Sequence, residues 1–178
     1  MIVRSLGLAQ RLDGMTATRG CWLISGSLFL LSSLAVGFAT AQGADPVRLI
    51  VTQSLVDGVA DLGLLGLYFG GLLRWRGLPG VSSVFLMLTV AVLGVLGFVL
   101  AAFWWLADVL HLPTDAVTGG YAAAILLLFM WNVMAVGQLA RQALNLSALM
   151  GLLVSLGYFI LSGVLIAALN LWLWPGQA

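Results

Sequence analysis

Lysine and glutamate are absent from the sequence, and cysteine and histidine each occur once, as Cys21 and His111. Without lysine there is no Walker-type phosphate loop, and without glutamate there is no H-E-x-x-H zinc-protease motif. A single cysteine excludes an intrachain disulfide and a multi-cysteine metal site. A single histidine excludes a haem held by two histidines of one chain. We therefore expect no cofactor and no metal site.

Charged residues are also scarce, making up 7% of the chain, against about a quarter in a soluble domain. The net charge is +1 and the basic residues are dispersed, so we expect no nucleic-acid partner. Apolar residues fill the sequence instead: 62% are hydrophobic and the mean hydropathy is +1.15. Such a chain needs lipid as its solvent, which makes membrane lipids its first expected partner.

The apolar residues fall into five runs, each long enough to cross a bilayer as a helix. A barrel would show alternating segments, whereas Phe85–Leu106 is continuously apolar. We predict an all-α membrane protein, a bundle of about five transmembrane helices with short loops, over residues 21–174. Residues 1–20 form a cytoplasmic N-terminal segment and 175–178 a C-terminal tail. The predicted runs are Cys21–Ala41, Leu49–Leu73, Val81–Leu106, Gly120–Leu139 and Ala148–Trp174.

The N-terminal region leaves two questions open. Apolar residues alternate with arginines in MIVRSLGLAQRL, which suits either an amphipathic helix on the membrane surface or a disordered basic tail. Ala39–Ala41 reads ATA, a small-x-small pattern that a signal peptidase could cut. The preceding apolar run is longer than a usual signal core, which favours a retained first helix.

The arginines predict an orientation for the bundle. Six of the seven fall on the side that holds the N-terminus, and Arg48 falls on the other. Arg74 and Arg76, in the turn after the second run, are the expected orientation anchors. The positive-inside rule places the N-terminus in the cytoplasm and the C-terminus outside. All basic residues are arginine and all acidic ones aspartate, which suggests a GC-rich bacterial gene and a multi-pass protein of the bacterial inner membrane.

One polar line interrupts the second run. Gln53, Asp57 and Asp61 are spaced four apart, so on a helix they lie on one face. A charged aspartate near mid-membrane costs about 2.5–3.5 kcal/mol, so each side chain is expected to pair, to face water or to stay protonated. The candidate polar partners lie in and just after the fourth run, and they are Asn132, Gln138 and Arg141.

Three interpretations of this line remain. It can be a set of polar contacts that hold helices together, a proton or ion path, or part of an interfacial segment with the true span beginning near Gly58. Small residues spaced four apart, such as Gly66 and Gly70, favour close helix packing, within the chain or in a dimer.

Two segments, Gly66–Gly94 and Leu128–Ile160, carry a resemblance to a family. They combine a Gly/Arg-containing turn after the second span with a polar hinge before the last. This pattern resembles that of the bacterial Yip1-domain-like five-span membrane proteins. The chain differs from it in having no proline within the third span. The resemblance implies an integral membrane protein and brings no catalytic residues with it.

No catalytic set is evident in the spans. Asp57 and Asp61 share one helix, whereas an intramembrane aspartyl protease needs carboxylates from different helices, and no base lies in a span beside a serine. We therefore predict that the chain is not an enzyme. Our hypothesis is an integral membrane accessory or interaction protein, with another membrane protein or a second copy as partner. The alternative is a small transporter or a proton or ion conduit that uses the polar line.

Overall fold

A computed structural model describes residues 19–40, 46–109 and 114–174, and within these residues the chain forms five helices and no strand. All five are long and apolar enough to cross a membrane, so the chain is a multi-pass membrane protein with the predicted all-α architecture. Of the predicted N-terminal segment at residues 1–20, residues 1–18 lie outside the described residues, as does the predicted tail at 175–178, and Arg19 begins the first described helix. The helices are α2 (Arg19–Thr40), α3 (Val47–Trp75), α4 (Pro79–Val109), α5 (Thr114–Leu144) and α6 (Ala148–Leu173).

The turn between α3 and α4 follows directly from its sequence. Gly77 adopts a left-handed backbone conformation with φ 72°, which is why glycine suits this position. The N–H of Leu78 donates to the carbonyl of Leu73, and the N–H of Gly77 donates to that of Arg74. This pair of bonds is a Schellman motif, and Pro79 then begins α4 at a position where no amide hydrogen is needed.

The turn between α5 and α6 uses the same device with asparagine. Asn145 has a φ of 51°, a conformation that asparagine tolerates better than most residues. The N–H of Leu146 donates to the carbonyl of Arg141 at 2.9 Å. The side chain of Ser147 then accepts from the N–H of Met150 and caps α6. Both turns lie where the sequence predicts a break.

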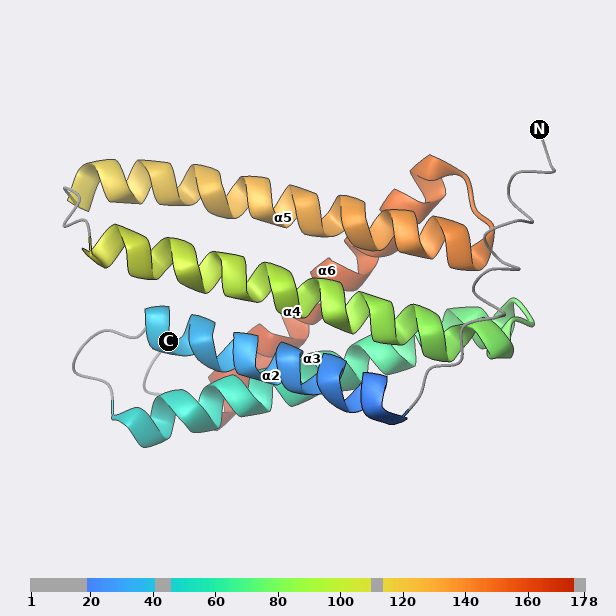
Figure 1. Cartoon of the computed structure of the whole chain (residues 1–178), viewed down its shortest axis with the longest axis horizontal. Helices are drawn as coiled ribbons and strands as arrows, with labels where there is room; N and C mark the ends of the chain where they lie inside the picture. Colours follow the sequence, from blue (N-terminus) through green and yellow to red (C-terminus); the bar gives the residue numbers. More distant parts are fainter. Residues whose placement is uncertain (1–18, 41–45, 110–113, 175–178) are drawn as a thin grey trace.

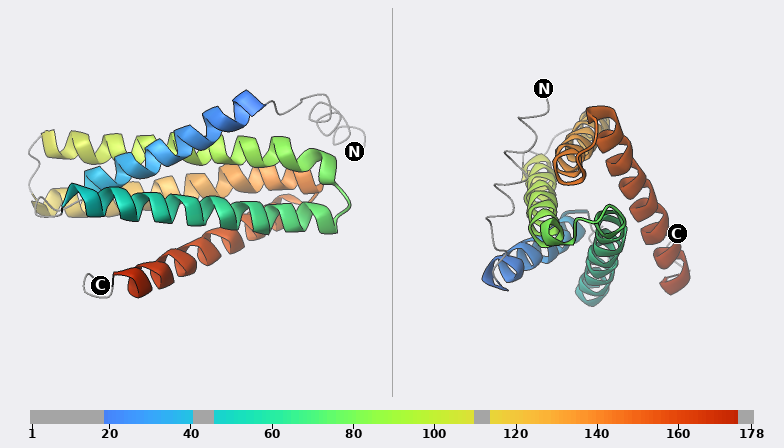
Figure 2. Two further views of the ribbon diagram at one scale, coloured as in Figure 1. Left: turned by 90° about the horizontal axis from the view of Figure 1, so that it is seen from below. Right: turned by 90° about the vertical axis from the view of Figure 1, so that its right-hand side faces the viewer.

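The helices form a ring in the order α2, α4, α5, α6 and α3, and α3 also packs against α4 across the bundle. Figures 1 and 2 show α3, α4 and α5 running lengthwise, whereas α2 is inclined to them and α6 crosses at an angle from the end of α5 towards α3. Because successive helices alternate in direction, four described arginines collect at one end, which we call the arginine end. They are Arg19, Arg74, Arg76 and Arg141. Arg48, in the first turn of α3, lies at the opposite end.

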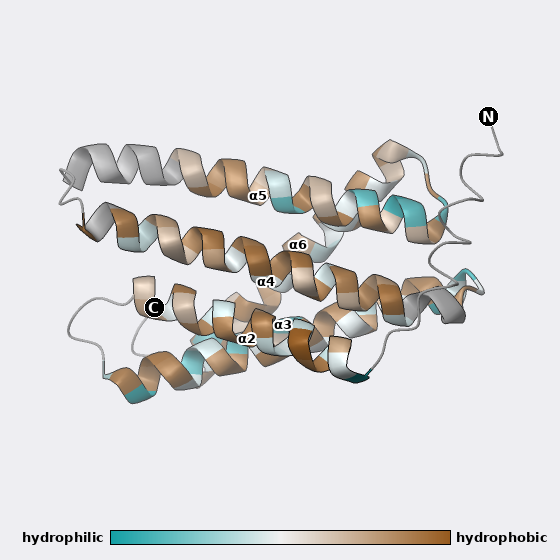
Figure 3. Ribbon diagram, in the orientation of Figure 1, coloured by the Kyte–Doolittle hydropathy of each residue, from teal (hydrophilic) through white to brown (hydrophobic). Residues whose placement is uncertain are grey.

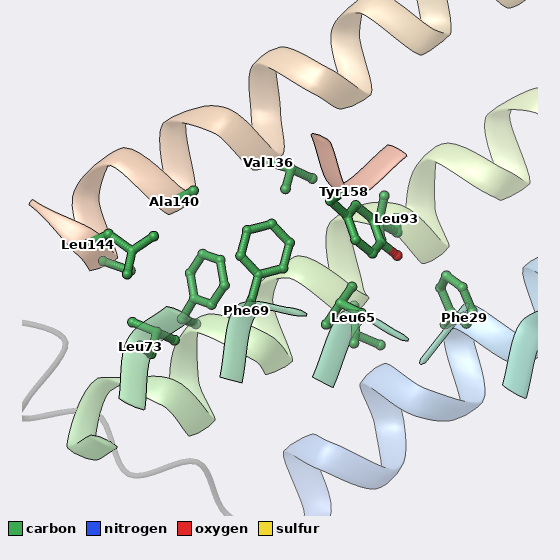
Figure 4. Packing of buried hydrophobic residues seen from close by; sticks show 12 residues of the cluster. Phe29, Leu65, Phe69, Leu73, Leu93, Val136, Ala140, Leu144 and Tyr158 are labelled. Carbon is green, nitrogen blue, oxygen red and sulfur yellow. The ribbon is translucent and has the colours of Figure 1, made fainter. Parts of the chain in front are cut away.

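The core lies towards the arginine end. Phe69 and Tyr158 are fully buried and Phe85 is 2% exposed, and their rings pack edge-on or tilted at centroid distances between 5.1 and 5.4 Å. Figure 4 shows this column running from Leu73 and Leu144 to Phe29. Figure 3 shows hydrophobic residues along most of each helix, and many large apolar side chains are exposed, which fits lipid as the surrounding solvent.

Small residues set the closest helix crossings. A Cβ added at Gly151 would lie 2.5 Å from the carbonyl oxygen of Gly137, so α5 and α6 touch through their backbones. A Cβ at Gly97 would lie 2.7 Å from Oγ of Ser32, where α2 meets α4. The predicted pair Gly66 and Gly70 behaves differently, because nothing lies within 4 Å of a Cβ added at either position. These two glycines do not mediate helix packing among the described residues.

Candidate functional site

The predicted polar line lies on one half-buried face of α3 and is directed at α6. At the middle of α3, the carboxylate of Asp61 accepts two hydrogen bonds from α6. The hydroxyl of Tyr158 donates at 2.7 Å and that of Ser162 at 2.5 Å, both to Oδ1. Hydrogen bonds to a carboxylate are the strong ones, and a membrane offers no water to replace them. Asp61 is therefore bound firmly between two helices.

Asp57 and Gln53 share a single partner nearer the opposite end. The side-chain amide of Gln53 donates to Oδ1 of Asn170 at 2.8 Å. The amide of Asn170 in turn lies 3.4 Å from each carboxylate oxygen of Asp57. These last two contacts are long for hydrogen bonds. Asp57 is thus held more weakly than Asp61.

A third contact extends the same interface towards the arginine end. The hydroxyl of Tyr68 on α3 donates to the backbone carbonyl of Val154 on α6 at 3.0 Å. We call the whole set the α3–α6 polar seam. Its members are Gln53, Asp57, Asp61 and Tyr68 on α3 and Val154, Tyr158, Ser162 and Asn170 on α6.

The hydrogen-bond partners of the polar line differ from those expected from the sequence. The polar line bonds to α6, not to the fourth-run residues Asn132, Gln138 and Arg141. Gln138 and Arg141 are exposed on α5, and the amide of Asn132 donates to the Leu128 carbonyl of its own helix at 3.0 Å. The physical reason is the tilt of α6, which carries it from α5 across to α3.

The α6 partners carried a signal that the sequence reasoning missed. Tyr158, Ser162 and Asn170 are separated by multiples of four residues in a run that is otherwise apolar. On a helix they lie near one face, as the polar residues of α3 do. Two matching polar lines on different helices predict a shared interface, because neither line can face lipid cheaply.

A cavity of about 590 Å³ lies beside the seam, and residues of all five helices line it. Its apolar wall includes Leu93, Leu96, Phe129 and Phe159. The rings of Phe129 and Phe159 meet at 5.6 Å and join α5 to α6 there. Because Ile125 and Phe129 are 38% and 41% exposed, the cavity opens to its surroundings along α5. Its polar lining residues are Ser32, Ser33, Gln53, Ser54, Asp57 and Asn132.

Asn132 lines this cavity, and not all of its polar side-chain atoms form hydrogen bonds with described residues. Its Oδ1 is buried and has no hydrogen-bond partner among the described residues. An unpaired buried acceptor of this kind costs about 1–3 kcal/mol, so it calls for an explanation. Asp61, by contrast, does not line the cavity, although it lies one helical turn from Asp57. The polar line of α3 is therefore divided between a closed part and an open part.

The described residues contain no group of three or more histidine, cysteine or acidic side chains that could hold a metal ion. Cys21 is exposed near the start of α2. Arg74 and Arg76, the expected orientation anchors, are both exposed at the arginine end. Comparison of the chain with known proteins found no matching family model, no matching curated protein and no matching solved structure.

Proposed function

We propose that the chain is an integral membrane accessory or interaction protein without catalytic activity. The observation that carries this proposal is the bonding of Asp61, which accepts from both Tyr158 and Ser162. A carboxylate that accepts two short hydrogen bonds across a helix interface serves to join the helices. The seam then gives a rigid five-helix body whose outward apolar faces meet lipid or another membrane protein.

The second candidate is a small transporter or a proton or ion conduit. Asp57 favours it, because this carboxylate lines an open cavity inside the membrane-spanning part. A conduit also needs a path from the cavity to the arginine end. The buried column of Phe69, Phe85 and Tyr158 fills that part of the bundle, which supports the accessory role over the conduit.

The compartment and orientation belong to the same proposal. We place the chain in a bacterial inner membrane with its arginine end in the cytoplasm. The four described arginines at that end, against Arg48 at the other, support this orientation through the positive-inside rule. The resemblance to Yip1-domain-like proteins is consistent with a membrane protein of this size and adds no activity.

Partners are proposed from the surfaces that the bundle leaves open. Gly66 and Gly70 lie on α3 with free space where side chains would be, so another helix could approach closely there. We therefore expect either another membrane protein or a second copy of the chain as partner, in addition to lipid.

The deciding experiment is a proton-flux assay on purified protein in liposomes. The wild type and Asp61→Asn should both show no more pH-driven flux than protein-free liposomes. Tyr68→Phe serves as the matched seam variant, since it removes a hydroxyl without touching a carboxylate. Flux in the wild type that disappears in a folded Asp61→Asn protein would overturn the accessory role and establish the conduit.

A further inference from the structure

The cavity beside the seam has an unusual balance of hydrogen-bonding groups. Ser32 and Ser33 both donate their hydroxyl hydrogens to the carbonyl of Phe29 within α2. Gln53 donates from its amide to Asn170, and Asn132 donates from its amide to Leu128. Each of these side chains donates at least one of its hydrogens to a partner within the protein.

Asp57 strengthens this imbalance because an ionised carboxylate can only accept. Its amide contacts from Asn170 are 3.4 Å long, and no ion pair joins it to another described residue. No described arginine lines the cavity. Asp57 thus lines the cavity with only two long contacts from the Asn170 amide and with no described cation facing it.

We propose that this cavity binds a hydrophobic organic ammonium ion. The protonated amine would lie at Asp57 and donate to its carboxylate, while the apolar body packs against Leu93, Leu96 and Phe129. An organic cation supplies the positive charge that the described lining lacks, and its N–H groups can donate to the carboxylate. The proposal does not depend on the accessory role, because that role rests on the bonds of Asp61, which lies outside the cavity, whereas the binding site rests on Asp57.

Size and access agree with this ligand class. A volume of about 590 Å³ falls within the range of roughly 300–1,000 Å³ that is usual for small-molecule sites. Most of the lining is aliphatic or aromatic, which suits an apolar body of one or two rings. The opening along α5 lies among apolar side chains, so a hydrophobic amine already dissolved in the membrane can reach it.

Membrane lipids are a second possible source of an ammonium group. Phosphatidylethanolamine carries a primary amine, but its phosphate would bring a negative charge next to Asp57. No described basic side chain in the cavity could offset that charge. We therefore assign the site to an amine without an acidic group, and we expect phosphatidylethanolamine not to compete.

The test measures binding to the full chain in phosphatidylcholine nanodiscs, with empty nanodiscs subtracted. The probes are diphenylpropylamine, its neutral analogue diphenylpropanol and its anionic analogue diphenylbutanoate, which share an apolar body. The amine should bind at least about tenfold more tightly than the alcohol, and the carboxylate should not bind measurably. Equal affinities for amine and alcohol would overturn the proposal.

Variants locate the site. Asp57→Asn should weaken binding of diphenylpropylamine about tenfold or more. Asp61→Asn is the matched control, because it makes the same change one turn away and outside the cavity, and it should bind within about twofold of wild type. Loss of binding in Asp61→Asn with retention in Asp57→Asn would contradict the assignment.

A third variant keeps the proposal testable if Asp57→Asn does not fold. Leu128→Trp keeps every polar group and fills the cavity from α5, so it should abolish binding of the amine. Unchanged binding in a folded Leu128→Trp protein would place the site elsewhere and overturn the proposal. Competition by nanodiscs that contain phosphatidylethanolamine would overturn the assignment to an amine without an acidic group.

Discussion

Tyr158 donates a hydrogen bond of 2.7 Å to Asp61, and this bond joins the middle of α3 to the core side of α6. Tyr158 is fully buried and packs against Phe69, so one residue belongs to both the polar seam and the aromatic core. A change at Asp61 therefore acts on the packing of the bundle as well as on its polar contacts.

Two replacements of Asp61 should show whether the shape of its side chain or its hydrogen-bonding oxygen stabilises the contact between α3 and α6. Asp61→Asn keeps an oxygen that can accept from Tyr158 and Ser162, so the melting temperature in detergent should stay close to wild type. Asp61→Leu leaves both hydroxyls without an acceptor and should lower the stability. The loss is expected to be about 0.6 kcal/mol per bond from membrane-protein averages and up to about 1–3 kcal/mol if the hydroxyls stay dry. Equal melting temperatures for the Leu and Asn variants would mean that Asp61 contributes nothing to helix association.

The other end of the seam depends on Asn170. Asn170→Leu removes the acceptor for Gln53 and the amide that faces Asp57, so the C-terminal part of α6 should open more often. Amide hydrogen exchange in α6 beyond Ser162 should become faster, while exchange near Gly151 stays unchanged. Gln138→Leu is the matched control, because Gln138 is an exposed polar residue on α5 and should give wild-type exchange. A larger effect from Gln138→Leu would restore the partner expected from the sequence.

The contact between α5 and α6 tolerates no side chain at Gly151. Gly151→Ala would place its Cβ 2.5 Å from the Gly137 carbonyl oxygen and should destabilise the protein by about 1–3 kcal/mol through overpacking. Gly163→Ala lies on the same helix with nothing within 4 Å of its added Cβ. It should be neutral or more stable by up to about 1 kcal/mol, since alanine favours helix. Thermal unfolding of the two variants side by side checks this contrast, and a neutral Gly151→Ala would argue against the close crossing.

Reporter fusions test the orientation. Fusions after Arg76 and after Arg141 should report the cytoplasm, and a fusion near Thr114, where α5 begins, should report the outside. A cytoplasmic signal near Thr114 would be incompatible with five spans in the proposed orientation.

The arginine pair after α3 should act as an orientation anchor. Replacing both Arg74 and Arg76 with glutamine removes two of the four described charges from the arginine end and should raise the fraction of inverted molecules. Changing Arg48 to glutamine, at the opposite end, should leave the orientation unchanged. If the double variant is also unchanged, the N-terminal arginines are enough to orient the chain.

The spans and turns could be predicted because lipid imposes a simple rule on sequence. Backbone groups must be satisfied within each span, so a long apolar run has to be a helix. The ends were less accurate: α5 begins at Thr114 and ends at Leu144, beyond both ends of the predicted run Gly120–Leu139. The helix extends past the apolar run because its first and last turns lie beyond the hydrocarbon core, where polar residues carry no free-energy penalty.

The grouping of Gln53, Asp57 and Asp61 on one face could also be predicted, since it needs only the helical period. Their partners could not, because the choice between Asn132 and Asn170 depends on the tilt of α6. That tilt follows from the contact between Gly137 and Gly151 and from packing around Tyr158, which no local pattern encodes. The cavity escaped prediction for the same reason, as residues from five separate helices form it.

The close crossing of Gly137 and Gly151 also gives α6 the mechanics of a lever. Asn170 lies 19 residues beyond Gly151, or about 28 Å along a helix. A tilt of only about 10° at that pivot would move Asn170 by about 5 Å, farther than any hydrogen bond can stretch. The glycine pair and the seam are therefore coupled mechanically, with Asn170 as the point on α6 where a small rotation at the pivot becomes a large displacement beside Asp57.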